Sequence, residues 1–290
     1  MFDLDEKIKY LVIGDPISHS LSPEMQNPGF ETLGMGKCYG KLHVSLENFP
    51  EFVQFARKNL DGFNITVPHK QTIIPYLDSI SREAELTGSV NTVIIKSGKM
   101  HGESTDGFGL ENALREAFDF EVSGGTVLFI GCGGAVQATA FHFAAQGAKA
   151  LYFANRTLSK AEDLSSKISK NYPSCECSCC ALDDKENLKK FITKAAVVVQ
   201  GSSLGLKDSD PMPIDPALLQ DVCFYDTIYK ATPLLTAAKN TGLKTADGRT
   251  MLLHQGAKSL ELWTGQKAPV EQMRQALYQA IAERKKCSEK

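Results

Sequence analysis

The chain has 290 residues and a mass of 31.7 kDa, a length that predicts about two domains. Hydrophobic residues make up 42% of it and charged residues 23%, which excludes a disordered, collagen-like or coiled-coil protein. The formal net charge is −2 and the pI is about 6.3, so no general field attracts nucleic acid or an acidic membrane. The expected partner is a small molecule, or a protein met over a local patch.

The amino terminus has no targeting pattern. Residues 1–7 are acidic and lack the basic start and apolar run of a signal peptide. Later segments stay well short of the ~18 consecutive apolar residues of a membrane helix. We therefore expect a soluble, cytoplasmic protein.

The first part of the chain alternates short apolar runs with periodic stretches. Residues 10–13 and 63–67 predict strands, and residues 49–60 predict an amphipathic helix. Two more strands, residues 89–96 and 99–105, are predicted to form a hairpin across Ser97-Gly98.

The hairpin also predicts a juxtaposition. If the turn centres on Ser97-Gly98, the numbers of facing residues sum to about 195, by the pairing rule for such turns. Asn91 then faces Ser104, and Asp106 emerges close to Asn91.

The second part of the chain has a different pattern. After a helical stretch over residues 107–118, the apolar run Thr126–Ile130 is typical of a strand buried in a parallel sheet. Similar runs recur between helical or loop-rich stretches, at residues 150–153, 195–199 and 222–225. This alternation predicts a doubly wound α/β domain.

The tail, residues 251–286, is helical in pattern with a break at 265–269, and we expect it to pack back on the first part. The predicted fold class is therefore α/β with two domains. The predicted boundaries are residues 1–106 for a substrate domain, 107–248 for a nucleotide domain, and 249–290 for helices that complete the substrate domain.

A glycine turn follows the strand at Thr126–Ile130. Gly131, Gly133, Gly134 and Ala135 lead into a helix of small residues, which places backbone N–H groups against a pyrophosphate. The fit to Gly-x-Gly-x-x-Gly is imperfect, because Val136 stands at the third glycine position. The position of the turn between a strand and a helix favours dinucleotide binding over the alternative of a merely structural turn.

The end of the next strand predicts which dinucleotide binds. NAD-specific sites carry an acidic residue there, whereas this chain has Asn155, Arg156 and Thr157, followed by Lys160. Basic groups pair with a phosphate, so the expected cofactor is NADP(H). The alternative is a solvated basic loop.

Four polar residues of the first part are candidates for substrate chemistry. If their segment is extended, Ser20 and Ser22 point to one side and offer two hydroxyl donors to a carboxylate; otherwise they are turn formers. Lys70 stands where a helix is expected to begin, and is otherwise a surface lysine. Asp106 precedes Gly107 and is otherwise a helix N-cap.

The cysteines are too few for a disulfide scaffold, although Cys175, Cys177, Cys179 and Cys180 crowd together. A metal site usually pairs Cys-x₂-Cys with a second pair of ligands, which is lacking here. We expect reduced thiols around a strand or loop, and no metal.

Seven segments, in order, together resemble the shikimate dehydrogenase family from Gly14 to about Gly265: SHSLSP, NITVPHK, SVNT, STDG, GCGGA, NRT and MLLHQGA. The resemblance implies reversible, NADPH-dependent reduction of 3-dehydroshikimate to shikimate, on the chorismate pathway to aromatic amino acids. It also implies the two-domain architecture with a Rossmann-like NADP domain, acting as a monomer or homodimer.

The resemblance also implies roles for individual residues. Lys70 and Asp106 form the catalytic pair, and Ser20 and Ser22 hold the substrate carboxylate. The remaining substrate residues are Thr66, Asn91 and Gln255, which bind ring hydroxyls, and Tyr229, which borders the ring. The cofactor residues are Thr227 and Gly248 near the nicotinamide, with Gly131, Gly133, Gly134, Ala135, Asn155, Arg156, Thr157 and Lys160 binding the rest.

Three segments depart from the family pattern: residues 26–29 at the start of a helix, and residues 200–203 and 230–232 near the cofactor. Two other functions stay open. One is a quinate/shikimate dehydrogenase with a broader ring substrate and possible NAD use. The other is a non-catalytic dinucleotide sensor, which would need neither Lys70 nor Asp106. For the enzyme, closure of the two domains is expected to bring substrate and nicotinamide together.

Overall fold

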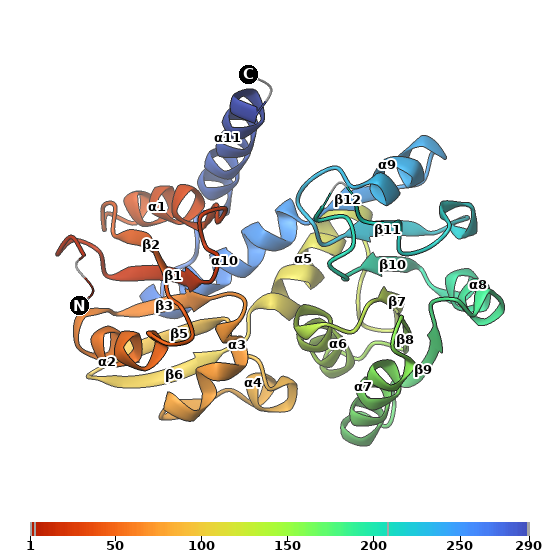
Figure 1. Ribbon diagram of the computed structural model, residues 1–290, viewed down its shortest axis with the longest axis horizontal. Helices are drawn as coiled ribbons and strands as arrows, with labels where there is room; N and C mark the ends of the chain where they lie inside the picture. Colours follow the sequence, from red (N-terminus) through yellow and green to blue (C-terminus); the bar gives the residue numbers. More distant parts are fainter. Residues whose placement is uncertain (1, 3, 208, 289–290) are drawn as a thin grey trace. The chain divides into compact units, whose positions relative to one another are not determined.

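The computed structural model describes residues 2, 4–207 and 209–288. The chain divides into two compact units, each drawn in Figure 1. The first unit contains Met1–Thr105 and Leu253–Lys290, and the second contains Asp106–Leu252. The fold class predicted from the sequence, α/β with C-terminal helices joined to the N-terminal part, is confirmed.

The first unit is built on a mixed sheet in the order β2-β1-β3-β5-β6-β4. Its strands are β1 (Tyr10–Gly14), β2 (Tyr39–His43), β3 (Gly62–Ile65), β4 (Ser79–Ile80), β5 (Thr92–Lys96) and β6 (Lys99–Glu103). Strands β1, β2 and β3 are parallel, while β3, β5 and β6 pair antiparallel. Its helices are α1 (Ser22–Thr32), α2 (Phe49–Asn59), α3 (His69–Thr72), α4 (Arg82–Thr87), most of α10 (Arg249–Thr264) and α11 (Val270–Ser288), with a 3₁₀ turn at Ile74–Tyr76.

The two-residue period of the strands divides the core of this unit into two layers. On one face, Leu11, Ile13, Phe63 and Ile65 pack with the buried side of α2. On the other face, the β1 residue Tyr10 stacks with Phe30 of α1, with a centroid distance of 4.6 Å, and contacts Trp263 of α10 at 4.9 Å. The C-terminal segment thus supplies part of the core.

The predicted hairpin is confirmed. Thr92 faces Glu103 and Lys96 faces Lys99, which is the predicted register. Ser97 and Gly98 both have positive φ, 51° and 73°, as a two-residue turn of this twist requires. Strand β5 begins later than predicted, at Thr92, because the N–H of Val90 donates to Lys70 instead of continuing the ladder.

The second unit is a fully parallel sheet in the order β12-β11-β10-β7-β8-β9. The order reverses at β7, which is the doubly wound arrangement of dinucleotide-binding domains. The strands are β7 (Thr126–Ile130), β8 (Ala150–Asn155), β9 (Glu176–Ala181), β10 (Val197–Gln200), β11 (Cys223–Asp226) and β12 (Thr245–Asp247).

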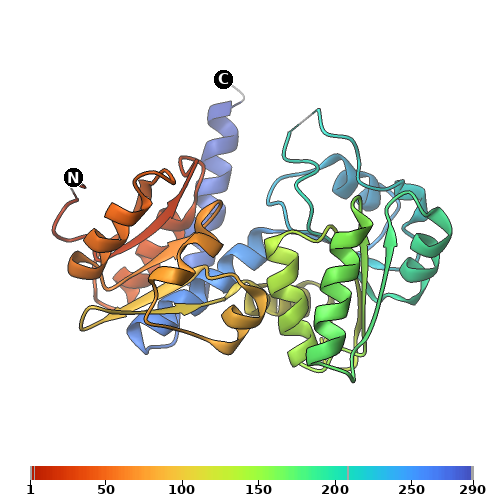
Figure 2. The same cartoon turned by 60° about the horizontal axis from the view of Figure 1, so that its bottom comes forward.

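Helices cover both faces of this sheet. They are α5 (Asp106–Phe118), α6 (Gly134–Ala145), α7 (Leu158–Asn171), α8 (Lys185–Lys194) and α9 (Pro233–Asn240), with a 3₁₀ turn at Pro216–Leu218. Figures 1 and 2 show α6 and α7 side by side on one face. Buried residues of α8 and α9, such as Leu188 and Leu234, pack on the other face against Leu128 and Phe224.

The sequence pattern misses β2, β4 and β12. These short strands carry no run of apolar residues, and the burial of β2 alternates because the strand lies at the edge of its sheet. The predicted strand at residues 63–67 ends early, at Ile65, where the chain turns toward α3.

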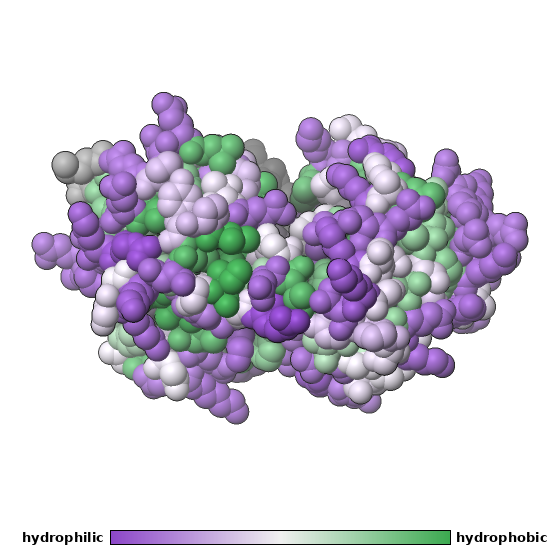
Figure 3. Space-filling model, turned by 90° about the horizontal axis from the view of Figure 1, so that it is seen from below, coloured by the Kyte–Doolittle hydropathy of each residue, from purple (hydrophilic) through white to green (hydrophobic). Residues whose placement is uncertain are grey.

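Figure 3 shows one face of the molecule, on which hydrophobic patches lie among hydrophilic side chains. Across the described residues, no helix is both long enough and apolar enough to cross a membrane.

Candidate active site

A buried network of side chains fixes Asn91 in the first unit. The Asn91 side-chain oxygen, Oδ1, accepts hydrogen bonds from the Thr105 N–H, at 2.9 Å, and from the Thr105 hydroxyl, at 3.2 Å. Its amide nitrogen donates to Thr105 Oγ1 at 3.0 Å and to Gln255 Oε1 at 3.5 Å. Asn91 and Gln255, predicted as substrate ligands and separated by 164 positions, are therefore brought together.

Asn64 extends this network toward the first helix. Its amide nitrogen donates to the backbone carbonyl of Asn91 and to the hydroxyls of Thr92 and Ser259, at 3.0–3.1 Å. Its oxygen accepts the Tyr39 hydroxyl at 2.7 Å. All four of these partners are buried, so each bond replaces one that water would otherwise make.

The network also reaches Ser20 and Ser22, the two serines predicted to bind the substrate carboxylate. Burial raises the pKa of the Tyr39 hydroxyl well above its usual value, opposed by a hydrogen bond with Ser22. The Ser22 hydroxyl in turn lies 3.2 Å from that of Ser20. A hydrogen-bonded series of side chains therefore runs from Ser20 to Gln255 within one unit.

Of the two alternatives for this segment, the structure shows the turn and not the extended chain. Ser22 is the first residue of α1, and Ser20 follows a turn in which its N–H donates to Ile17 O. The hydroxyls converge because the Ser20 oxygen accepts the Ser22 N–H at 3.3 Å, at the start of the helix.

Thr66 and Lys70 flank the turn between β3 and α3. The Thr66 N–H donates to Ile13 O, and a Cβ on Gly14 would lie only 2.5 Å from the Thr66 methyl, so Gly14 allows this close approach. Lys70 is the second residue of α3, half-buried, and its carbonyl accepts the Val90 N–H at 2.9 Å. The expected helix start at this lysine is confirmed.

Asp106 is the first residue of α5, one position earlier than the predicted helix start, and it is buried. It directly follows Thr105, the residue held by Asn91. Thr105, the last residue of the network in this segment, therefore fixes the chain directly before Asp106, the predicted catalytic aspartate.

In the second unit, the predicted glycine turn lies between β7 and α6. A Cβ at Gly133 or Gly134 would meet open space, and the N-terminus of α6 has no side-chain cap, so backbone N–H groups are available to a pyrophosphate. Gly131 has φ of +96°, a conformation that side chains rarely adopt. These features fit a dinucleotide.

Val136, at the position of the missing third glycine, is accommodated by another glycine. A Cβ on Gly201 would collide with the Val136 side chain, so Gly201 supplies the space that the motif usually provides at position 136. The N–H of Gly201 donates to Ile130 O at 2.9 Å, which fixes this approach.

The predicted basic segment follows β8. Asn155 ends the strand and donates from its amide to Thr157 O at 2.8 Å, while Arg156, Thr157 and Lys160 are exposed. Burial raises the pKa of the Cys132 thiol in the glycine turn to about 12, against a smaller lowering by the positive charge of Lys160. Positive charge is thus available beside the turn.

Thr227 and Gly248, predicted at the nicotinamide, meet through their backbones. A Cβ on Gly248 would collide with Thr227 O, so only glycine fits. Buried Asp226 accepts the Ile228 N–H at 3.0 Å and the Thr232 hydroxyl at 2.6 Å, which shapes the loop that carries Thr227 and the exposed Tyr229. Burial raises the pKa of Asp226 to about 6.

The segments that depart from the family pattern have clear structural roles. In α1, the Gln26 amide donates to Gly256 O at 2.9 Å, and Asn27 exchanges two hydrogen bonds with the Tyr39 backbone. Gly29 faces Leu260 and Met273, where a Cβ would lie 2.8 and 3.1 Å away. The sequence difference therefore serves close packing of α1 against α10 and α11.

The other two departures organise loops. The Gln200 side chain bonds the backbone of Ser202 and Leu204. Thr232 caps α9 by accepting the Leu235 N–H at 3.1 Å. Each loop is held by side chains different from those of the usual motif.

The cysteine-rich segment is a strand, β9, as one of the predicted alternatives stated. Cys175 and Cys177 share a hydrogen bond that lowers the pKa of Cys177 and, together with burial, raises that of Cys175. The seven cysteines from Cys38 to Cys223 are free thiols, and among the described residues no group of three His, Cys, Asp or Glu side chains is placed to hold a metal ion.

Sequence reasoning missed Asn64, Thr92, Thr105 and Ser259. Asn64 and Thr92 face each other across β3 and β5 in runs that otherwise read as apolar strands. A polar residue interrupting a buried run was the available signal, since burial of an amide requires partners. Thr105 and Ser259 carried no comparable local signal.

Comparison with known proteins places this chain in a family. Three family models match it: the shikimate dehydrogenase substrate binding domain at residues 12–93, shikimate / quinate 5-dehydrogenase at 112–204, and the shikimate 5'-dehydrogenase C-terminal domain at 248–278.

Individual relatives match over nearly the whole length. Shikimate dehydrogenase (NADP(+)) of Alkaliphilus metalliredigens is 38% identical, covering 92% of this chain and 94% of the relative, and that of Desulfitobacterium hafniense is 39% identical, covering 94% and 98%. A crystal structure of shikimate 5-dehydrogenase from Listeria monocytogenes, in complex with shikimate and NAD, superposes with a TM-score of 0.87 at 32% identity, covering 96% of this chain and 99% of that one. The chain therefore belongs to the shikimate dehydrogenase family.

Proposed function

We propose that this protein reversibly reduces 3-dehydroshikimate to shikimate with NADPH. The observation that carries the proposal is the hydrogen-bonded series from Ser20 to Gln255, which joins residue types suited to a carboxylate and to ring hydroxyls within one buried network. The same part of the chain matches the substrate-binding model of the family.

We assign the first unit to the substrate and the second to the cofactor. Ser20 and Ser22 present paired hydroxyls to the substrate carboxylate. Asn91 and Gln255, with Thr66, bind the ring hydroxyls. Because Asn91 is fixed by two bonds from Thr105, its side chain loses little further freedom when substrate binds. The exposed Tyr229 is the remaining residue that we assign to the substrate.

Lys70 and Asp106 form the proposed proton-handling pair. When bound, NADPH would supply the hydride that reduces the substrate carbon, and the substrate oxygen would then carry negative charge. The Lys70 ammonium stabilises this oxyanion and donates a proton to it, with Asp106 orienting the ammonium. Residues 90–91 link the two positions, because Val90 bonds the Lys70 carbonyl and Asn91 bonds Thr105, the neighbour of Asp106.

The cofactor role rests on the glycine turn and the basic segment. The N-terminus of α6 receives the pyrophosphate, and Arg156 pairs with the 2′-phosphate that distinguishes NADP from NAD. Lys160 adds charge beside the same turn. Thr227 and Gly248 border the nicotinamide.

The direct test mixes purified protein with NADP⁺ and shikimate and follows near-ultraviolet absorbance. Formation of NADPH supports the proposal, and its absence contradicts it. Parallel assays with quinate and with NAD⁺ test the quinate/shikimate alternative suggested by the name of one matching family model. Absence of turnover with every cyclohexene or cyclohexane acid, despite NADP⁺ binding, would instead favour a dinucleotide sensor.

A further inference from the structure

The loop between β1 and α1 carries Ser20 and leads to Ser22. Two basic side chains from other elements donate hydrogen bonds to its backbone carbonyls. Lys41 of β2 donates to Ser18 O at 3.1 Å. Arg284 of α11 donates to His19 O at 2.8 Å and, from its second terminal nitrogen, to Ser20 O at 3.1 Å. Three consecutive carbonyl groups therefore accept bonds from cations.

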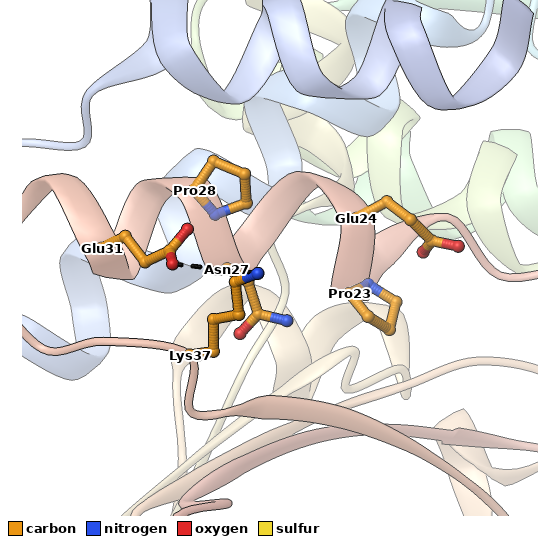
Figure 4. A pocket seen from close by; sticks show the side chains of 6 residues that line it. All are labelled: Pro23, Glu24, Asn27, Pro28, Glu31 and Lys37. Atoms are coloured by element: carbon orange, nitrogen blue, oxygen red, sulfur yellow. Dashed lines mark ion pairs between the residues drawn. The ribbon is translucent and has the colours of Figure 1, made fainter. Parts of the chain in front are cut away.

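Arg284 is itself fixed to the helix that begins at Ser22. Its Nη2 donates to Glu24 Oε1 at 2.9 Å. Glu24 lies in the first turn of α1, and Figure 4 shows it at the opposite end of a surface cavity of about 250 Å³ from the Glu31–Lys37 ion pair. One guanidinium thus connects the loop before the helix with the first turn of the helix.

The ion pair alone contributes little, because its side chains are 40% and 36% exposed. The planar fork matters more, since a guanidinium can bond several acceptors in a fixed geometry, which an ammonium cannot. By binding the carbonyls of residues 19 and 20, it fixes the orientation of those peptide groups. The Ser20 hydroxyl, which accepts the Ser22 N–H, is fixed with them.

Peptide orientation bears directly on anion binding. Carbonyl oxygens repel a carboxylate, whereas N–H and O–H groups attract it, so a loop that serves an anion must keep its carbonyls occupied elsewhere. The packing of α11 along α1 allows this contact, because Gly29 lets Met273 approach closely. A residue near the C-terminus is thereby connected to the N-terminal serines.

We propose that Arg284 is a positioning residue that holds the Ser20 and Ser22 hydroxyls in place for the substrate carboxylate. This inference rests on the proposed function, in which those hydroxyls bind the carboxylate of shikimate. Arg284 itself acts through the loop and does not touch the substrate.

The test measures steady-state oxidation of shikimate by the full-length protein and by Arg284→Gln, Arg284→Lys and Lys286→Gln. We expect Arg284→Gln to raise KM for shikimate about tenfold, as loss of charge-assisted hydrogen bonds would, while kcat and KM for NADP⁺ change less than about threefold. Arg284→Lys, which keeps the charge without the fork, is expected to recover only part of the loss. Lys286→Gln removes the same charge from an exposed position two residues along α11 and controls for net charge.

Each other outcome overturns the inference. An unchanged KM for shikimate in Arg284→Gln, an equal increase in Lys286→Gln, or a parallel loss of kcat and of NADP⁺ affinity would exclude a positioning role. If Arg284→Gln does not fold, Glu24→Gln takes its place, and an unchanged KM there overturns the inference as well. Failure of the wild-type protein to oxidise shikimate would instead contradict the proposed function.

Discussion

The two units build their sites from different parts of the polypeptide. In the first, polar side chains that stand on strands, Asn64 and Thr92 among them, form a buried network that fixes the candidate substrate ligands. In the second, the strands at the switch point are apolar, and the candidate cofactor site is made of backbone N–H groups and glycines at the strand ends. Recognition of a particular ring is thus expected to depend on side chains, and binding of a common cofactor on backbone geometry.

The largest expected effect tests the chemistry assigned to Lys70 in the first unit. Lys70→Ala removes the ammonium proposed to stabilise the oxyanion, so we expect kcat to fall ~10²-fold or more, with a smaller change in substrate affinity. Steady-state kinetics with shikimate and NADP⁺ measures this. Near-normal turnover would remove Lys70 from the mechanism.

A second prediction tests the close packing of Gly201 against Val136 beside the glycine turn of the second unit. Gly201→Ala places a methyl group against Val136, and overpacking of this kind costs ~2 kcal/mol of unfolding free energy. Adding Val136→Ala should restore most of this loss, because the two side chains share one space. Urea unfolding of both single variants and the double variant measures the coupling. Additive losses would show that the two positions are independent.

A charged side chain is nevertheless proposed to distinguish the two cofactors. Arg156→Ala should lower the ratio of kcat/KM for NADP⁺ over that for NAD⁺ about tenfold, as loss of one phosphate partner would. Assays with the two cofactors at fixed shikimate give the ratio. The exposed Lys170→Ala on α7 is the control for net charge. An unchanged ratio in Arg156→Ala would refute the assignment of this arginine.

The smallest expected effect concerns buried Asp226. Its pKa is about 6 in the folded protein and about 3.8 when unfolded, so the folded state binds the extra proton between these values. Its contribution to stability is present below about pH 4 and is lost as the pH rises through about 6. Between about pH 5 and pH 7 we expect a loss of ~1 kcal/mol that Asp226→Asn does not show.

Urea unfolding across this pH range measures the difference between wild type and Asp226→Asn. The exposed Asp183→Asn serves as the control and should follow the wild-type slope. Identical slopes for wild type and Asp226→Asn would show that this carboxyl titrates alike in both states.

Local signals in the sequence were sufficient for much of the molecule. The apolar run at Thr126–Ile130, the Ser97-Gly98 turn and a helix that begins about where Lys70 lies each depend on a few neighbouring residues, and each is confirmed. The strong apolar runs revealed the parallel sheet, because such strands are buried on both faces. The edge strand β2 was missed because only part of it is buried.

Tertiary structure alone decided how the polar residues are connected. The sequence by itself determined the fold class, the glycine turn and the ordered motifs, since these are properties of contiguous segments. It did not determine that Ser22 starts a helix, that Gly201 makes room for Val136, or that Asn64 and Ser259 belong to the network of Asn91. These contacts join residues up to 195 positions apart, and hydrogen bonding and packing at such separations depend on how whole elements are placed, which no local pattern encodes.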